Sequence, residues 1–164
     1  MTPQRGAAFL IPSGRITHMN HVHPAAPSSA QSSPLVVVAA AVVQDGRLLV
    51  VSKKAAPDMF YLPGGKPDAD EGTLETLIRE FEEELGVQPL EPQFLADVEA
   101  VAALEGLPMK MTVFQARLSG TPLPAAELAQ MRWVSGREKD LHLAPAVRDH
   151  VLPLLRQRGV LAAY

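Results

Sequence analysis

The chain has 164 residues, with 15 basic and 18 acidic residues and a net charge of −3 at pH 7. This length fits one domain with a substantial core, and a content of 47% hydrophobic and 20% charged residues is typical of a folded protein. The absence of cysteine excludes disulfides, thiolate zinc sites and a cysteine nucleophile, and the acidic balance disfavours nucleic-acid binding.

Residues 1–34 differ from the rest because they contain five prolines and no acidic residue. Such a segment buries too little apolar surface to offset its ordering entropy, so we expect a flexible arm. The short apolar stretch 7–11 offers the alternative that the arm docks on a neighbouring subunit, and the protein is expected to be a monomer or a homodimer. His18, His21 and His23 lie in this arm and are interpreted as incidental rather than as a metal site.

From residue 35 the pattern predicts regular structure. Residues 35–43 are apolar and rich in valine, which indicates a buried strand; at nine residues the run is too short to span a membrane, and we expect a cytoplasmic protein. Asp45-Gly46 predicts a hairpin turn, and residues 47–52 form the returning strand. A short strand at 60–62 ends at a Pro-Gly-Gly sequence.

A helix is predicted over residues 72–85, with Gly86 as its C-cap. The helical spacing of its apolar residues defines one face, made of Leu74, Leu77, Ile78, Phe81 and Leu85. Strands are expected at 94–101, 109–118 and 131–135. Residues 146–158 have helical spacing, interrupted by Pro153, which should kink or split that helix.

The helix at 72–85 carries the chemistry. Glu80, Glu83 and Glu84 lie at positions i, i+3 and i+4, so we expect their carboxylates to share a face away from the apolar one. Like charges at this spacing repel, and the negative end of the helix dipole lies nearby. These penalties favour a bound cation, and an all-carboxylate set favours Mg²⁺ or Mn²⁺. A solvated acidic face is the alternative.

The surrounding residues complete a longer pattern, G-x5-E-x7-R-E-U-x-E-E-x-G-U, where U is apolar. Its nine specified positions are filled by Gly65, Glu71, Arg79, Glu80, Phe81, Glu83, Glu84, Gly86 and Val87. This resembles a complete Nudix box, and the resemblance to the Nudix hydrolase family extends over residues 35–164. It implies an α/β fold, an α/β/α sandwich in which a mixed β-sheet lies between helices and the box forms a loop–helix–loop. It also implies hydrolysis of a nucleoside diphosphate linked to another moiety, with Mg²⁺ or Mn²⁺ as cofactor.

The resemblance also implies roles for residues of the box. Glu80, Glu83 and Glu84 match the metal-binding carboxylates of the family, and the carbonyl of Gly64 matches a further ligand in MutT-like members.

Arg79 and Glu71 match the pair that braces the loop against the helix, and Glu75 is placed to share Arg79. Asp70 stands where relatives commonly have glycine, and aspartate tolerates a positive φ there.

Outside the box, Glu127 precedes Trp133 as a glutamate does in MutT-like relatives, and is a candidate fourth carboxylate for metal or for the proton of water. The alternative is an ordinary loop glutamate. Lys66 matches a MutT-like lysine that neutralises phosphate charge. Lys53 and Lys54 are candidates for the same role, against the alternative of a solvated pair.

The substrate is the least determined property. A nucleoside triphosphate, oxidised or not, is favoured because positions 102–104 lack the proline typical of ADP-ribose hydrolases and the tyrosine typical of dinucleoside polyphosphate hydrolases. Two further alternatives are a nucleotide-sensing module without catalysis, disfavoured by the complete box, and an RNA 5′-pyrophosphohydrolase, disfavoured by the net charge.

Overall fold

The computed structural model describes residues 33–162, so the arm's histidines and apolar stretch 7–11 lie outside the described residues. In the described part of the chain, no helix is long and apolar enough to cross a membrane. The elements follow in chain order: β1 (Leu35–Ala41), β2 (Val43–Gln44), β3 (Arg47–Lys53), β4 (Ala56–Tyr61), β5 (Gly64–Gly65), α1 (Thr73–Leu85), β6 (Pro89–Val101), β7 (Pro108–Leu118), β8 (Leu128–Val134), β9 (His142–Leu143), η1 (Val147–Val151) and α2 (Leu152–Gln157).

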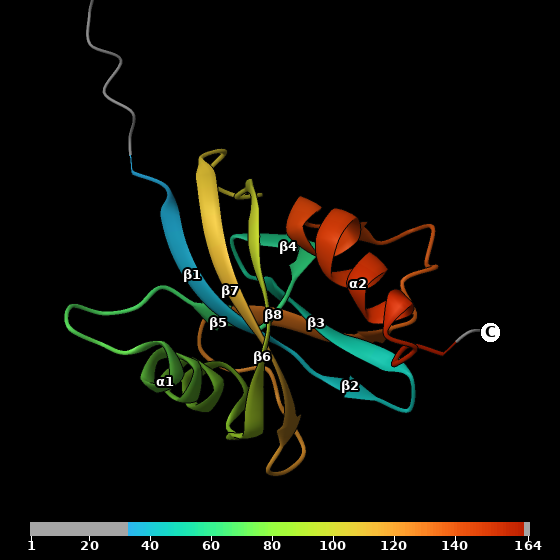
Figure 1. Ribbon diagram of the computed structural model, residues 1–164, viewed down its shortest axis with the longest axis horizontal. Helices are drawn as coiled ribbons and strands as arrows, with labels where there is room; N and C mark the ends of the chain where they lie inside the picture. Colours follow the sequence, from blue (N-terminus) through green and yellow to red (C-terminus); the bar gives the residue numbers. More distant parts are fainter. Residues whose placement is uncertain (1–32, 163–164) are drawn as a thin grey trace, which may run out of the picture. The chain divides into compact units, whose positions relative to one another are not determined.

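The strands form two mixed sheets. The first has the order β5-β1-β7-β6, in which β1 and β7 are parallel and the other pairs are antiparallel. In the second, β3 pairs with β2, β4 and β8, and β9 adds to β4 in parallel. The helices lie on opposite sides of the strands in Figure 1, with α1 toward the lower left and α2 toward the upper right. This is the sandwich that the sequence predicts, with its strands grouped in two sheets.

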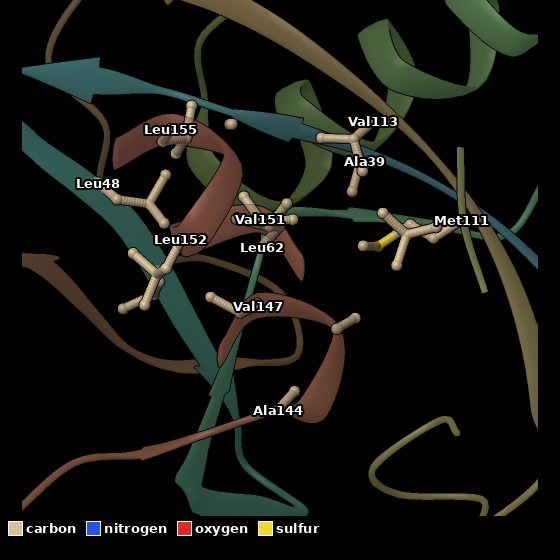
Figure 2. Packing of buried hydrophobic residues seen from close by; sticks show 14 of the residues in the cluster. Ala39, Leu48, Leu62, Met111, Val113, Ala144, Val147, Val151, Leu152 and Leu155 are labelled. Carbon is tan, nitrogen blue, oxygen red and sulfur yellow. The ribbon is translucent and has the colours of Figure 1, made fainter. Parts of the chain in front are cut away.

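Both faces of the central strands are buried, which explains their continuous apolar sequences. In β1, Val38 and Ala40 pack in the core beneath α1, whereas Ala39 and Ala41 pack in the core beneath α2. The side chains of β3 alternate in the same way between the two cores. Figure 2 shows the second core, where Leu152 and Leu155 of α2 meet residues of β1, β3 and β7.

Pro153 divides the C-terminal helix, as predicted. The segment η1 is a π-helical turn in which the N–H of Leu152 bonds the carbonyl of Val147, and α2 begins there with Pro153 in its first turn. Proline has no N–H to donate, and the first turn of a helix is where that loss costs least.

Three strands are longer than the sequence predicts. The strand expected at 60–62 begins at Ala56, the one at 94–101 begins at Pro89, and the one at 131–135 begins at Leu128. Pro89 and Pro92 lie inside β6, where the pairing with β7 is irregular between Leu90 and Gln93. Tertiary pairing here overrides the local preference of proline.

Candidate active site

The loop before α1 is held against the helix by the sheet. Gly64 and Gly65 form β5, which pairs with Val38 and Ala39 of β1, and a Cβ atom at Gly65 would overlap the carboxylate of Glu80. A side chain at Gly65 would therefore displace the Glu80 carboxylate, whereas Gly64 has φ 145 and a Cβ there would overlap the backbone of Val38 and Ala39, so glycine is required at position 64.

Glu84 is a buried carboxylate. Its side chain is 2% exposed, and its Oε2 accepts the N–H of Gly64 at 3.2 Å. Burial, and to a smaller extent the nearby charge of Glu80, raise the pKa of Glu84 from 4.5 to about 8, although the Gly64 N–H and Lys53 oppose the shift. Within residues 33–162 no basic side chain forms an ion pair with Glu84. The site thus holds a carboxyl group whose ionised form is disfavoured by burial and is stabilised mainly by the N–H of Gly64.

The three helix carboxylates differ in burial, whereas the sequence predicts that they share a face away from the apolar one. Glu80 and Glu84 are buried, whereas the side chain of Glu83 is 55% exposed. Leu74 and Ile78 are also exposed rather than part of the apolar face. The buried face of α1 is rotated toward its acidic residues, because β5 and β1 lie against that side. Burial raises the pKa of Glu80, while its bond to Arg79 opposes the shift.

Arg79 connects the loop to the helix. Its Nε and Nη2 donate to the two carboxylate oxygens of Glu71 at 2.8 and 2.9 Å, which is a bidentate pair. Nη1 donates to Glu80 at 2.9 Å and to Glu83 at 3.4 Å, and Nη2 also bonds the carbonyl of Lys66 at 3.0 Å. The guanidinium therefore braces the loop, as predicted, and also neutralises two of the helix carboxylates.

The loop carboxylate is bonded from three sides. Glu71 accepts from Arg79, from the hydroxyl of Thr76 at 2.7 Å and from the N–H of Asp68 at 3.1 Å. These bonds lower the pKa of Glu71 to about 2, and the bond from Arg79 contributes most. Asp70 has φ 62, so aspartate occupies a left-handed position as predicted.

The sequence also places Glu75 where it could share Arg79, but the structure does not show this contact. Glu75 accepts the N–H of Gly72 at 3.4 Å, at the beginning of α1, and no bond to Arg79 is found in the described part of the chain.

Of the candidate residues outside the helix, Lys53, Lys66 and Glu127 form ion pairs. Lys53 Nζ lies 3.2 Å from Glu127 Oε1 and 5.8 Å from the ring centre of Tyr61. Lys66 Nζ lies 3.5 Å from Glu105. Lys54 meets Glu127 only through its backbone, its N–H bonding the Glu127 carbonyl at 2.8 Å.

A pocket adjoins these groups. Gly64, Lys53 and Lys66 line it, whereas Lys54 is not among the described residues that do. Its other walls come from β7, from the loop between β6 and β7 and from the chain around η1. The structure thus places two of the three predicted phosphate-binding lysines at one pocket, next to the buried carboxylates.

The donor set fits a hard divalent cation. Glu80 and Glu84 offer oxygen only, and a buried carboxylate without an ion-pair partner among the described residues is the kind of group that a cation stabilises. Among residues 33–162 no three carboxylate or imidazole side chains are already gathered as ligands. Arg79 holds Glu80 and Glu83, and Lys53 holds Glu127, so binding of a metal requires these side chains to exchange partners.

Sequence reasoning missed two residues of this region. Tyr61 lines the pocket, and Glu105 reaches Lys66 from the loop between β6 and β7. The position of Tyr61 next to the Pro-Gly-Gly sequence is a signal that would have found it. Glu105 has no such signal, because it is 39 residues from Lys66.

Comparisons with protein families and with solved structures both indicate the Nudix family. The model of the NUDIX domain family matches residues 34–155. A MutT NUDIX hydrolase from Burkholderia pseudomallei is 32% identical, covering 76% of this chain and 98% of that chain, with a TM-score of 0.64. No curated protein matches the sequence.

More distant structures share the fold. A UDP-X diphosphatase is 23% identical over 81% of this chain and 67% of its own, with a TM-score of 0.66. An ADP-ribose pyrophosphatase from Streptococcus suis is 19% identical over 77% and 92%, with a TM-score of 0.61. At these identities the likeness concerns the fold alone.

Proposed function

The chain belongs to the Nudix family of pyrophosphohydrolases, and we propose that it hydrolyses nucleoside triphosphates to the monophosphate and pyrophosphate. The observation that carries this proposal is that the buried carboxylates of Glu84 and Glu80 lie against Gly64 and Gly65, and that Gly64 lines a pocket together with Lys53 and Lys66. An acidic site alone repels a polyphosphate, whereas acidic groups that hold a cation, with lysines at the rim, attract one.

We propose that Glu80, Glu83, Glu84 and the Gly64 carbonyl bind Mg²⁺ or Mn²⁺. A bound divalent ion clamps phosphate oxygens and lowers the pKa of a bound water. Arg79, held by Glu71, fixes the loop that carries Gly64 against the helix that carries the carboxylates.

The remaining groups act on substrate and proton. Lys53 and Lys66 exchange their present partners, Glu127 and Glu105, for phosphate oxygens. Lys54, the third predicted phosphate-binding residue, does not line the pocket and contributes charge from the rim. Release of Glu127 from Lys53 frees its carboxylate for the metal or for the proton of the attacking water. Water adds to the α- or β-phosphorus and loses a proton to a carboxylate, the P–O bond that bridges these two phosphorus atoms breaks, and the monophosphate and pyrophosphate are released.

An assay of reaction products tests this proposal. We expect a nucleoside triphosphate, incubated with Mg²⁺ or Mn²⁺, to give the nucleoside monophosphate and pyrophosphate in equal amounts. The panel includes 8-oxo-dGTP, ADP-ribose, dinucleoside polyphosphates and capped RNA. Release of inorganic phosphate with a nucleoside diphosphate contradicts the proposal, as does hydrolysis of ADP-ribose without hydrolysis of any triphosphate.

A further inference from the structure

The pocket beside α1 is charged at one end and apolar at the other. Lys53, Lys66 and Glu105 lie at the charged end, since Lys66 follows Gly65 of the box and pairs with Glu105. The apolar walls come from separate parts of the chain and include Leu62, Met109, Met111, Ala144 and Val147. Figure 2 shows Leu62, Met111, Ala144 and Val147 within the core cluster from which these walls are built.

Two large apolar side chains of this lining are incompletely covered. Val101 is 53% exposed and Leu104 is 42% exposed, and both belong to the segment where β6 passes into the loop before β7. A ligand with a flat, weakly polar group would cover them and gain from removing this surface from water. A nucleotide has such a group at one end and its phosphates at the other, which matches the polarity of the pocket.

The lining offers few hydrogen-bonding groups to distinguish one base from another. Among the described lining residues, Tyr61 is the one uncharged polar side chain, and its hydroxyl oxygen is buried without a hydrogen-bond partner rather than open to the pocket. Three backbone donors of the wall are already used. The N–H groups of Ala102, Ala144 and Val147 bond the carbonyls of Leu107, Phe60 and Ala144.

We propose that this pocket receives the nucleobase by shape and apolar contact, with Leu104 as its outer wall, and that it discriminates weakly among bases. The inference rests on the proposed function and narrows it, because it makes the chain a hydrolase of broad base specificity rather than one that selects a single oxidised base. Sites built on hydrogen bonds reject a wrong partner by about 10⁴- to 10⁵-fold, whereas apolar pockets distinguish similar groups by about 10- to 200-fold.

Two leucines of one loop provide the test. Leu104 lines the pocket, whereas Leu107 is 41% exposed, lies three residues further along and is not among the described lining residues. Leu104→Ala is expected to weaken binding of dAMP, dGMP, dCMP, dTMP and 8-oxo-dGMP, each by about 5- to 20-fold, because alanine is too short to cover the base. Leu107→Ala is expected to leave all five dissociation constants unchanged. Calorimetry on the metal-free protein measures them, and melting curves check that both variants are folded.

In the wild type we expect the five dissociation constants, and the kcat/KM values of the five corresponding triphosphates, to lie within about 30-fold of one another. A preference of more than about 1,000-fold for one base overturns the proposal, even if that triphosphate is hydrolysed as proposed above. Equal effects of the two leucine variants, or no binding of any monophosphate, also overturn it. Binding of all five monophosphates without hydrolysis of any triphosphate instead supports this inference and contradicts the proposed function.

Discussion

Arg79 and Glu84 explain how an acidic helix is stable without metal. Arg79 bonds Glu71, Glu80 and Glu83, so part of the repulsion that the sequence implies is neutralised by a cation of the chain itself. Glu84 receives one N–H, that of Gly64, and burial raises its pKa to about 8. In the metal site that we propose, a proton and a metal ion therefore compete for this carboxylate.

Replacement of Glu84 by Gln tests this competition. The folded state of the metal-free protein binds the Glu84 proton more tightly than the unfolded state, so its stability falls as pH rises from 4.5 toward 8. With chelator present, we expect Glu84→Gln to be more stable than the wild type at pH 8.5, by at least about 1 kcal/mol, and equally stable near pH 4.5. Melting curves at the two pH values measure the difference.

The same variant loses function. We expect Glu84→Gln to lower turnover by at least about 100-fold, since the charge of a bound metal is worth several kcal/mol in the transition state. Added Mg²⁺ or Mn²⁺ should raise the Tm of the wild type and raise that of the variant much less. Normal turnover with equal stabilisation by metal would remove Glu84 from the set of ligands.

The ion pair of Glu71 and Arg79 predicts a pH dependence of stability that is opposite in sign to that of Glu84. Its bonds hold the pKa of Glu71 at about 2, so the ionised group stabilises the fold fully above pH 4.5, and this stabilisation is lost as pH falls through 2. We expect Glu71→Gln to lower the Tm at pH 7, and its difference from the wild type to shrink between pH 4.5 and 2. Glu99→Gln, an exposed residue 3.8 Å from Lys110, is the control that should show no such difference.

Among the elements, the two-residue strand β5 positions the site. Pairing with β1 fixes its backbone, which leaves Gly64 and Gly65 in contact with the carboxylates of α1. The C-terminal end of α1 is equally defined, because Gly86 has φ 66 and its N–H bonds the carbonyl of Glu82. The C-terminal end of the helix is thereby fixed, and its buried Glu80 and Glu84 face the loop.

Two glycine variants test whether the contact of Gly65 with Glu80 matters for turnover, or whether any loss of backbone flexibility in the loop has the same effect. A Cβ at Gly65 overlaps Glu80, whereas a Cβ at Gly72 meets nothing closer than 3.8 Å and Gly72 has φ −74. Gly65→Ala should therefore displace Glu80 and reduce turnover by at least about 10-fold, about 1.4 kcal/mol in the barrier. Gly72→Ala should change turnover by less than a factor of about 2 and cost no more than about 1 kcal/mol as a helix cap. Steady-state kinetics on both proteins compares them, and equal losses would assign the effect to the loop as a whole.

On the scale of the molecule, both hydrophobic cores are built from residues between Val38 and Leu161. The family match begins at residue 34. We therefore propose that residues 35–164 form the catalytic domain and that residues 1–34 are an arm, either flexible or docked on a partner subunit.

Removal of the arm tests this division. A chain that starts at Pro34 is expected to keep the Tm and the kcat/KM of the full chain, because the described residues of both cores and of the site all follow position 34. Size-exclusion chromatography with light scattering then compares the oligomeric states. A dimer that becomes a monomer on truncation would show that the stretch 7–11 docks on the partner, and a large loss of Tm would contradict the division.

The sequence by itself predicted the order of the longer strands, the limits of α1, the split at Pro153 and the identity of the box residues, although not the two-residue strands β2, β5 and β9 as separate elements. These properties depend on neighbours within one helix turn or one hairpin, or on a fixed spacing, and local chemistry is sufficient to predict them. The bidentate pair of Arg79 and Glu71 belongs to this group, since both lie within the box.

Tertiary structure alone decided which carboxylates are buried. Helical spacing places Glu80, Glu83 and Glu84 on one side of α1, but the position of β5 and β1 buries two of them and leaves Glu83 exposed. Contacts between distant segments also decided the pairings of Lys53 with Glu127 and of Lys66 with Glu105. Burial and pKa depend on what packs against a side chain in space, and a sequence pattern records only the neighbours along the chain.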